Sequence, residues 1–164
     1  MQKCSRCEKQ VPAPGAMNLK PVTTDLCPRC VDYFELREVA DICQYIENLP
    51  APILVVDGDG MVRGANTQAC KAVSKDLPHI VNLRGGDVFE CAHARLPGGC
   101  GRTVHCSGCT VRRAVLDTLS TGNPLSGISV EVLQNVKGKD RRVTFQISTQ
   151  RLANCVLLQI DGGL

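Results

Sequence analysis

From Ile53 onward, the apolar residues follow the patterns of β-strands more often than those of helices. The run Ile53–Val56 is entirely apolar, and an Asp/Gly turn at residues 57–60 follows it before a short return strand, which predicts a β-hairpin. Three more strands are predicted at about 126–133, 141–150 and 153–160, where apolar and polar residues alternate between turn signals. The pattern therefore indicates a domain rich in antiparallel strands.

Helical spacing is found in two longer segments and in one short one. Residues 31–49 contain no Gly or Pro and repeat apolar side chains three or four positions apart, until Pro50 ends the pattern. We interpret this helix either as packing on the domain that follows or as a dimerising linker. A second helix is predicted at 111–119, and a short one is predicted after the N-cap residue Asn66.

The composition limits the architecture and the class of partner. With 164 residues, of which 43% are hydrophobic, the chain has room for one ordinary domain, or for a domain plus a very small one. Aromatic residues make up only 3%, so the core must be aliphatic. The net charge of +3, without a long basic run, makes nucleic-acid binding a poor prediction. Because no signal peptide or apolar span is found, we expect a cytoplasmic protein without a membrane segment.

Cysteine is the unusual residue of this composition, with eleven copies. In a reducing compartment, this number points to metal binding or redox chemistry rather than to a disulfide framework. The first group is Cys4-x2-Cys7 with Cys27-x2-Cys30, a spacing that is typical of a structural zinc site. The segment between the two pairs is rich in proline and buries little by itself. Zinc would therefore supply the folding free energy of residues 1–30.

The second group lies in the loop 91–109 and consists of Cys91, Cys100, Cys106 and Cys109. A proline and several glycines exclude a regular helix or strand there, so the loop needs another form of stabilisation. Four thiolates suit zinc and an iron–sulfur cluster equally well by ligand type and number. A metal-free thiol switch is a third interpretation.

Two histidines are further candidate ligands, whereas the three remaining cysteines are not. His93 and His105 lie in the same loop, and either can replace one of its cysteines as a metal ligand. Cys43, Cys70 and Cys155 lie in apolar segments, and we interpret them as packed core thiols.

The order of the predicted elements, together with one motif, resembles a PAS domain. The motif is Ile53-Leu-Val-Val-Asp57-Gly-Asp-Gly-Met-Val-Arg-Gly-Ala-Asn66, in which a strand, an Asp-Gly turn, a second strand and an Asn precede a helix. The resemblance covers residues 50–163. It implies an α+β fold with a PAS-like five-stranded antiparallel sheet and flanking helices, and a central helix at 111–120 packed across the sheet. It also implies a sensor or interaction module, usually dimeric and often preceded by a helix.

The cysteine loop is similar to that of a metal-binding subset of bacterial sensory PAS domains. That subset carries a Gly-Cys step, a Gly-Cys-Gly and a Cys-x-x-Cys just before the central helix. The counterparts here are Cys91, Gly99-Cys100-Gly101 and Cys106-Ser-Gly-Cys109. The chain departs from the pattern at Glu90, where the subset tends to have glycine. The resemblance implies that the four loop cysteines form one metal site.

These interpretations divide the chain into three parts. They are a zinc-ribbon-like module at 1–30, a connecting or dimerisation helix at 31–49, and a PAS domain at 50–164. The sequence has no phosphate-binding loop, nucleophile elbow or kinase catalytic segment, so we expect no enzymatic activity. The chain ends with its last predicted strand, and we expect its signal to leave through a protein partner.

We therefore predict a cytoplasmic signalling sensor or adaptor, homodimeric, that acts through a partner such as a signalling kinase or regulator. In this hypothesis, a change of redox, oxygen or metal state at the Cys91–Cys109 site shifts the helix that begins near Thr110. One alternative is a protein–protein adaptor whose zinc sites are purely structural. A less favoured alternative is a nucleic-acid-binding regulator.

Overall fold

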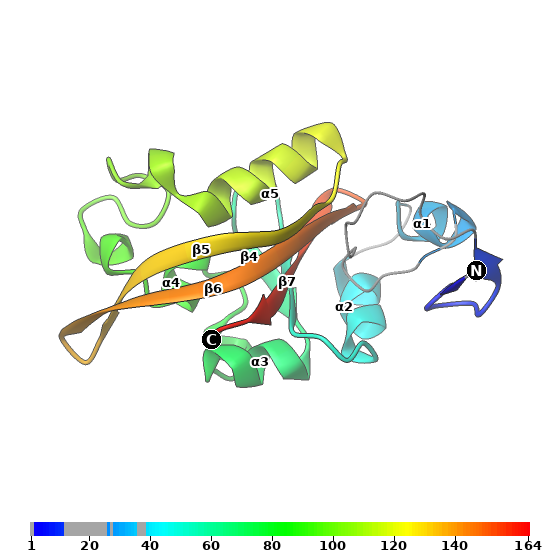
Figure 1. Cartoon of the computed structure of the whole chain (residues 1–164), viewed down its shortest axis with the longest axis horizontal. Helices are drawn as coiled ribbons and strands as arrows, with labels where there is room; N and C mark the ends of the chain where they lie inside the picture. The colour runs from blue at the N-terminus through cyan, green and yellow to red at the C-terminus, as the bar shows by residue number, and fades with distance from the viewer. Residues whose placement is uncertain (1, 12–25, 27, 36–38) are drawn as a thin grey trace.

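A five-stranded antiparallel sheet forms the centre of the protein (Figure 1). The computed structural model describes residues 2–11, 26, 28–35 and 39–164. The strands lie in the order β4-β3-β7-β6-β5, and each neighbouring pair is antiparallel. Their bounds are β3 Ile53–Val56, β4 Val62–Ala65, β5 Leu125–Val136, β6 Lys139–Leu152 and β7 Cys155–Gly162. Together with the helices that flank it, this sheet confirms the predicted α+β, PAS-like fold class.

The predicted Asp/Gly hairpin joins β3 to β4. The Asp57 carboxylate closes the turn by accepting hydrogen bonds from the amides of Asp59, at 3.0 Å, and Met61, at 2.9 Å. Gly60 has a φ of +78°, a left-handed value that favours glycine. Burial opposes ionisation of Asp57, but the two amides and the Arg63 guanidinium at 2.6 Å outweigh it and lower the pKa of this carboxyl.

Helices and short 3-10 turns connect the hairpin to the last three strands. Asn66 is the N-cap residue that the sequence predicted, and its Oδ1 accepts from the Ala69 amide at 2.9 Å. The longest of these helices matches the predicted central helix, ends at Gly122 and packs against β5, β6 and β7. The elements are α3 Thr67–Val73, η1 Leu77–His79, α4 Gly85–Val88, η2 Ala92–Arg95, η3 Cys106–Gly108 and α5 Thr110–Thr121.

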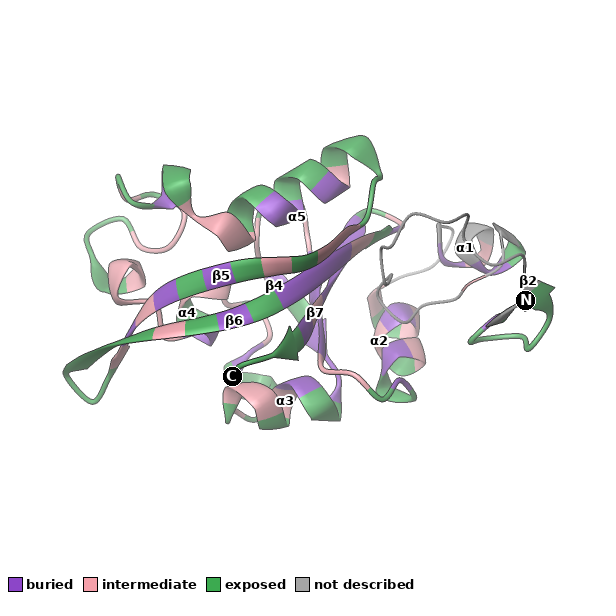
Figure 2. Ribbon diagram, in the orientation of Figure 1, coloured by how far each residue is buried: buried purple, intermediate pink, exposed green. Residues whose placement is uncertain are grey.

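Strand β3 is buried on both of its faces, which explains its uninterrupted apolar run. Successive side chains of a strand point to opposite faces. Leu54 and Val56 accordingly belong to the core under α5, and Ile53 and Val55 belong to a second core on the other face. Figure 2 shows buried positions on both α5 and α2. A strand with only one buried face would have shown alternation instead.

Helix α2 (Val39–Glu47) covers the second face with Ile42 and Ile46, both of which are buried. It contacts β3 and β4, so the prediction that this helical segment packs on the following domain is confirmed. The helix that precedes it is α1 (Pro28–Glu35), and residues 36–38 lie outside the described ranges. In the described part of the chain, no helix has both the length and the apolar character needed to cross a membrane.

The first residues form a small unit of their own. Strand β1 (Gln2–Lys3) pairs with β2 (Gln10–Val11) in a two-stranded antiparallel sheet. Cys4 and Cys7 lie in the connection between these strands, and the Glu8 amide donates to the Cys4 carbonyl at 2.9 Å. The turn therefore presents both cysteines of the first Cys-x2-Cys pair from one short segment.

An aromatic cluster attaches this unit to the helices. The Arg6 guanidinium stacks over the Tyr33 ring at 3.6 Å, and the rings of Phe34 and Tyr45 pack with their centroids 5.0 Å apart. The Ser5 and Tyr45 hydroxyls share a hydrogen bond of 2.6 Å. Contacts thus run from the cysteine turn through α1 to α2, which lies on the sheet.

Candidate functional site

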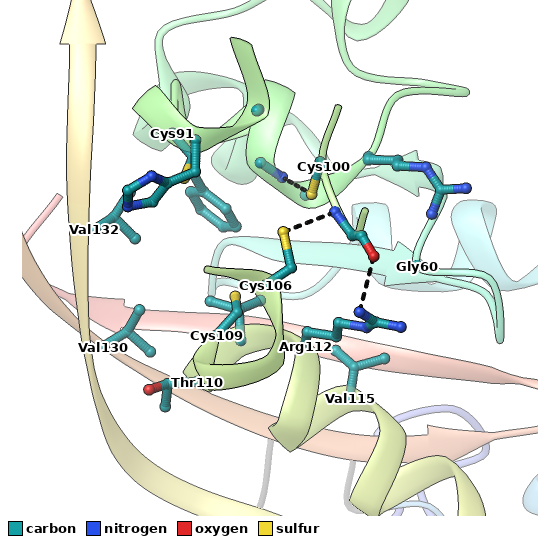
Figure 3. Close-up of a pocket in the computed structure, with 18 of the residues that line it drawn as sticks. Gly60, Cys91, Cys100, Cys106, Cys109, Thr110, Arg112, Val115, Val130 and Val132 are labelled. Atoms are coloured by element: carbon teal, nitrogen blue, oxygen red, sulfur yellow. Dashed lines mark hydrogen bonds between the residues drawn. The ribbon is translucent and has the colours of Figure 1, made fainter. Parts of the chain in front are cut away.

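A cavity of about 710 Å³ lies between α5, the loop 91–109 and the sheet (Figure 3). The strands line it with aliphatic side chains, and α5 adds Val111 and Val115. The opposite wall is the cysteine loop. All four loop cysteines line this one cavity, namely Cys91, Cys100, Cys106 and Cys109.

The loop is fixed at both ends to elements of the domain. Cys91 forms an isolated β-bridge with Gln134 of β5, and the Glu90 carbonyl accepts from the Asn135 amide at 2.8 Å. At the other end, Cys109 is the N-cap residue of α5, as the sequence predicted for the start of that helix. The loop is therefore joined to a strand at one end and to a helix at the other.

Cys100 is held against α4 by close packing. The Gly86 amide donates to the Cys100 sulfur at 3.3 Å, and a Cβ on Gly86 would lie only 2.7 Å from that sulfur. Glycine at position 86 is therefore required by the approach of the thiol. Burial is the main reason why the pKa of Cys100 is raised, and the neighbouring Cys106 and Cys109 add to the effect.

The Cys106 sulfur is held by two hydrogen bonds within the loop. Its sulfur accepts from the Gly101 amide at 3.1 Å and shares a hydrogen bond of 3.2 Å with the Thr103 hydroxyl. Burial opposes ionisation, but these bonds and the charge of Arg112 outweigh it, so the pKa of Cys106 is lowered. A lowered pKa favours the thiolate, which is the form that binds metal.

The spacing of the thiols distinguishes the two cysteine groups. A tetrahedral zinc ion with Zn–S bonds of about 2.3 Å holds its sulfurs about 3.8 Å apart. The sulfurs of Cys4, Cys7 and Cys30 lie within 4.8 Å of one another and fit a single ion. Among the described residues this is the only such trio, so no three loop thiols come that close. The loop thiols are thus less closely gathered than this trio.

Of the second Cys-x2-Cys pair, Cys27 and Cys30, the structure describes only Cys30. Cys27, the predicted fourth ligand, lies outside the described residues. Cys30 is buried on α1, and its sulfur accepts from the Arg6 guanidinium at 3.7 Å. This bond adds a positive charge beside the trio, as a site of negatively charged thiolates requires.

The two candidate histidines lie against each other. The rings of His93 and His105 stack with centroids 3.9 Å apart and an angle of 18° between their planes. Both residues line the cavity beside the thiols. No set of three ligand atoms that includes either ring lies within 4.8 Å among the described residues, so the geometry gives them a packing contact.

Glu90, which stands where similar PAS domains tend to have glycine, has a left-handed φ of +57°. Its carboxylate is held by Lys75 at 2.7 Å and Arg95 at 3.3 Å. The hydrogen bond from Lys75 is the main reason why the pKa of Glu90 is lowered. The turn that glycine would form without strain is thus formed here with two ion pairs.

The other cysteines lie away from the cavity. Cys155 is buried, while Cys43 and Cys70 are partly buried against the two cores. Burial raises the pKa of all three thiols, which keeps them protonated. The prediction that they are packed thiols agrees with these positions.

Sequence reasoning missed the four arginines that line the cavity, and two of them, Arg84 and Arg112, bond to backbone carbonyls. The other two are Arg102 and Arg142. Arg84 donates to the Asp59 carbonyl at 2.7 Å, and Arg112 donates to the Gly101 carbonyl at 3.0 Å. Their partners are backbone atoms of distant turns, so no motif marks them. The absence of any Asp or Glu from residues 91–109 was the one available signal that this wall is positively charged.

No protein-family model matches the chain, and no curated protein matches its sequence. Several solved structures are similar to it. A domain of the sensory box sensor histidine kinase/response regulator from Geobacter sulfurreducens is 16% identical, covering 76% of this chain and 94% of that one, with a TM-score of 0.49. The PAS domain of nitrogen regulation protein NR(II) from Vibrio parahaemolyticus is 19% identical, covering 75% and 97%, with a TM-score of 0.46.

A third similar structure is the photoactive yellow protein domain of the sensor histidine kinase Ppr from Rhodospirillum centenum. It is 11% identical and covers 80% of this chain and 99% of that one, with a TM-score of 0.43. These likenesses concern the fold alone.

Proposed function

We propose that the protein is a non-enzymatic signalling sensor in which Cys91, Cys100, Cys106 and Cys109 hold a metal centre whose state is passed to α5. The observation that carries this proposal is that all four thiols line one cavity bounded by that helix and the sheet. Thiolates are soft ligands that select zinc, copper(I) or iron–sulfur clusters. The PAS-like fold, whose members are sensor or interaction modules, gives such a centre a use.

An iron–sulfur cluster is the occupant that we favour for the loop. No three of the loop thiols lie within 4.8 Å of one another, which is looser than the spacing that a single tetrahedral ion imposes. A bound cluster would supply a group that is sensitive to oxygen and redox state. The chain's own part is to provide thiolates, to exclude water with the aliphatic side chains of the sheet, and to connect the loop to α5.

The N-terminal trio supports a separate, structural zinc site made by Cys4, Cys7 and Cys30 together with Cys27. The three described sulfurs have the spacing of one ion. The unit that contains them has little apolar core of its own, with Leu26 packed against the two buried cysteines. Zinc would stabilise this unit outright.

The test is anaerobic purification followed by iron, sulfide and zinc analysis and a visible spectrum. We expect a brown protein with iron, sulfide and one zinc per chain, which bleaches in air. Cys106→Ser should lose the iron and keep the zinc, while Cys70→Ser, a control thiol outside the cavity, should keep both. A loop that takes up neither iron nor zinc would contradict the proposal.

We also propose that the protein is a homodimer in the cytoplasm. Its signal would pass to a protein partner, such as a signalling kinase or regulator. Light scattering of the anaerobic and air-treated protein measures the oligomeric state in each form. A constant state in both forms, with partner binding also unchanged, would remove the sensing role.

The second candidate is a protein–protein adaptor with two structural zinc sites. It is favoured by the attachment of the N-terminal unit to α1 and α2 through Arg6, Tyr33 and Tyr45. A colourless protein with two zincs per chain and no response to air would support this candidate over the sensor.

A further inference from the structure

Gly101 is the residue at which the cysteine loop and α5 are joined. Its amide donates to the Cys106 sulfur at 3.1 Å, and its carbonyl accepts from the Arg112 guanidinium at 3.0 Å (Figure 3). Arg112 lies in the first turn of α5. A single residue therefore links a candidate ligand sulfur to a side chain of the helix.

A second guanidinium, that of Arg84, lies near Gly101 on the sheet side. Arg84 donates to the Asp59 carbonyl of the β3–β4 turn at 2.7 Å, and the same nitrogen lies 3.6 Å from the place of a Cβ on Gly101. Gly101 itself has a φ of +85°, which glycine adopts without strain. Gly101 is thus bonded to Arg112 of α5 and has the Arg84 guanidinium beside it.

These two arginines have no carboxylate partner in the described part of the chain. The ion pairs there are Arg63–Asp57, Lys75–Glu90, Arg95–Glu90 and Arg142–Glu131. The acidic residues that line the cavity are Asp59 and Glu131, and Glu131 is already paired. Each guanidinium has five N–H donors and here uses one nitrogen. These two guanidiniums therefore give the cavity wall positive charge that no carboxylate of the described residues neutralises.

We infer that Arg112 is a positioning residue that couples the ligation of Cys106 to the first turn of α5, with Arg84 as its counterpart on the sheet side. The inference rests on the proposed function, because four thiolates carry more negative charge than a zinc ion or a cluster core neutralises. That excess charge attracts both guanidiniums and strengthens the Gly101 amide bond to sulfur. Loss of the centre removes the attraction and frees the first turn of α5.

The chain offers a matched control for this idea. Arg113 is the next residue on the same helix, is exposed, does not line the cavity and has no side-chain hydrogen bond in the described part. Arg112→Gln and Arg113→Gln therefore remove the same charge from adjacent positions. Arg112→Lys keeps the charge but loses the planar fork that reaches the Gly101 carbonyl.

The first measurement is competition between the protein and a chelator for the loop metal, under anaerobic conditions. We expect Arg112→Gln to weaken metal affinity about 10-fold to 100-fold, as loss of a group that orients a ligand does. Arg112→Lys should recover part of this loss, and Arg113→Gln should stay within about twofold of the native protein because it touches neither loop nor sulfur.

The second measurement is amide hydrogen exchange, which reports the coupling itself. Metal binding should slow exchange in the first turn of α5 in the native protein and in Arg113→Gln. In Arg112→Gln, the same amides should not respond even when the site is saturated with metal, a result that a merely weaker site would not give.

Two outcomes separate the inference from the proposed function. If Arg112→Gln matches Arg113→Gln in both measurements while the loop still binds metal, the inference is overturned and the metal site stands. If the native loop binds no metal, the proposed function falls. Hydrogen exchange of the Gly101 amide in the metal-free protein then tests whether Arg112 holds Gly101 against the Cys106 sulfur. Faster exchange in Arg112→Gln than in Arg113→Gln would then support it, and equal rates would overturn it.

Discussion

The stacked rings of His93 and His105, with centroids 3.9 Å apart, join the start of the cysteine loop to the segment before η3. These rings were candidates for metal ligation by residue type, since imidazole nitrogens bind zinc and iron. Their stacking also joins two separate parts of the loop beside the thiols that line the cavity.

Substitutions at His105 distinguish stacking from ligation. His105→Phe keeps an aromatic ring without a ligating nitrogen, so we expect its loop metal to be retained as in the native protein. His105→Ala should lose about 0.5–1.5 kcal/mol of loop stability, the magnitude of an aromatic pair. Chelator titration compares metal retention in the two variants. Val104→Ala is the control, because Val104 is 87% exposed. Equal metal loss in the Phe and Ala variants would instead identify His105 as a ligand.

Outside the metal sites, we expect substitution of Asn66 to cause the largest loss in the free energy of unfolding. Its buried side chain accepts from the amides of Ile53 and Ala69 and donates to the carbonyls of Ile46 and Ala51. Asn66→Ala leaves these groups without partners, so we expect the free energy of unfolding to fall by at least about 3 kcal/mol. Urea denaturation measures the loss. The exposed Asn48→Ala is the control and should change stability by less than about 0.5 kcal/mol.

The contact between Gly64 and Cys43 predicts a reciprocal pair of substitutions. A Cβ on Gly64 would lie 2.1 Å from the Cys43 sulfur, so Gly64→Ala should destabilise the fold by about 1–3 kcal/mol. Cys43→Ala removes that sulfur, and the double variant should recover much of the loss. A double-mutant cycle gives the coupling. Strict additivity of the two substitutions would contradict direct packing of α2 on β4.

Glu90 predicts a dependence of stability on pH. Its pKa is lower in the folded than in the unfolded chain, so its ion pairs stabilise the fold above the unfolded value of about 4.3. That stabilisation is lost as the pH falls through the folded pKa. Glu90→Gln should therefore be less stable by about 0.5–1 kcal/mol at pH 7, and as stable as the native protein in strong acid. A constant difference across the range would exclude the ion pairs as its cause.

Much of the fold could be predicted from the sequence because its determinants are local. The β3–β4 hairpin follows from the side chain of Asp57 and the left-handed Gly60, and α5 follows from its apolar period and Gly122. Strands β5 and β6 are longer than predicted, reaching Val136 and beginning at Lys139. Their ends are polar and mostly exposed, so pairing rather than burial extends them, and periodicity does not record pairing.

The candidate site was only partly predictable. Four cysteines in one loop can be read from the sequence, and the structure brings them to one cavity. The contacts of Arg84 and Arg112 could not be read, because each guanidinium bonds a carbonyl of a turn far away in the chain. An arginine on the exposed side of a helix has the same pattern whether it faces water or the edge of a cavity.

The aromatic cluster around Arg6 has a practical consequence for optical measurement. Tyr33 and Tyr45 are the two tyrosines of the chain, which has no tryptophan. Tyrosine emission of the whole protein therefore originates in α1 and α2, beside the first cysteine group. Tyrosine fluorescence therefore reports on the N-terminal unit. Visible absorption reports on any chromophore bound by the loop, so the two sites can be followed by different signals in one sample.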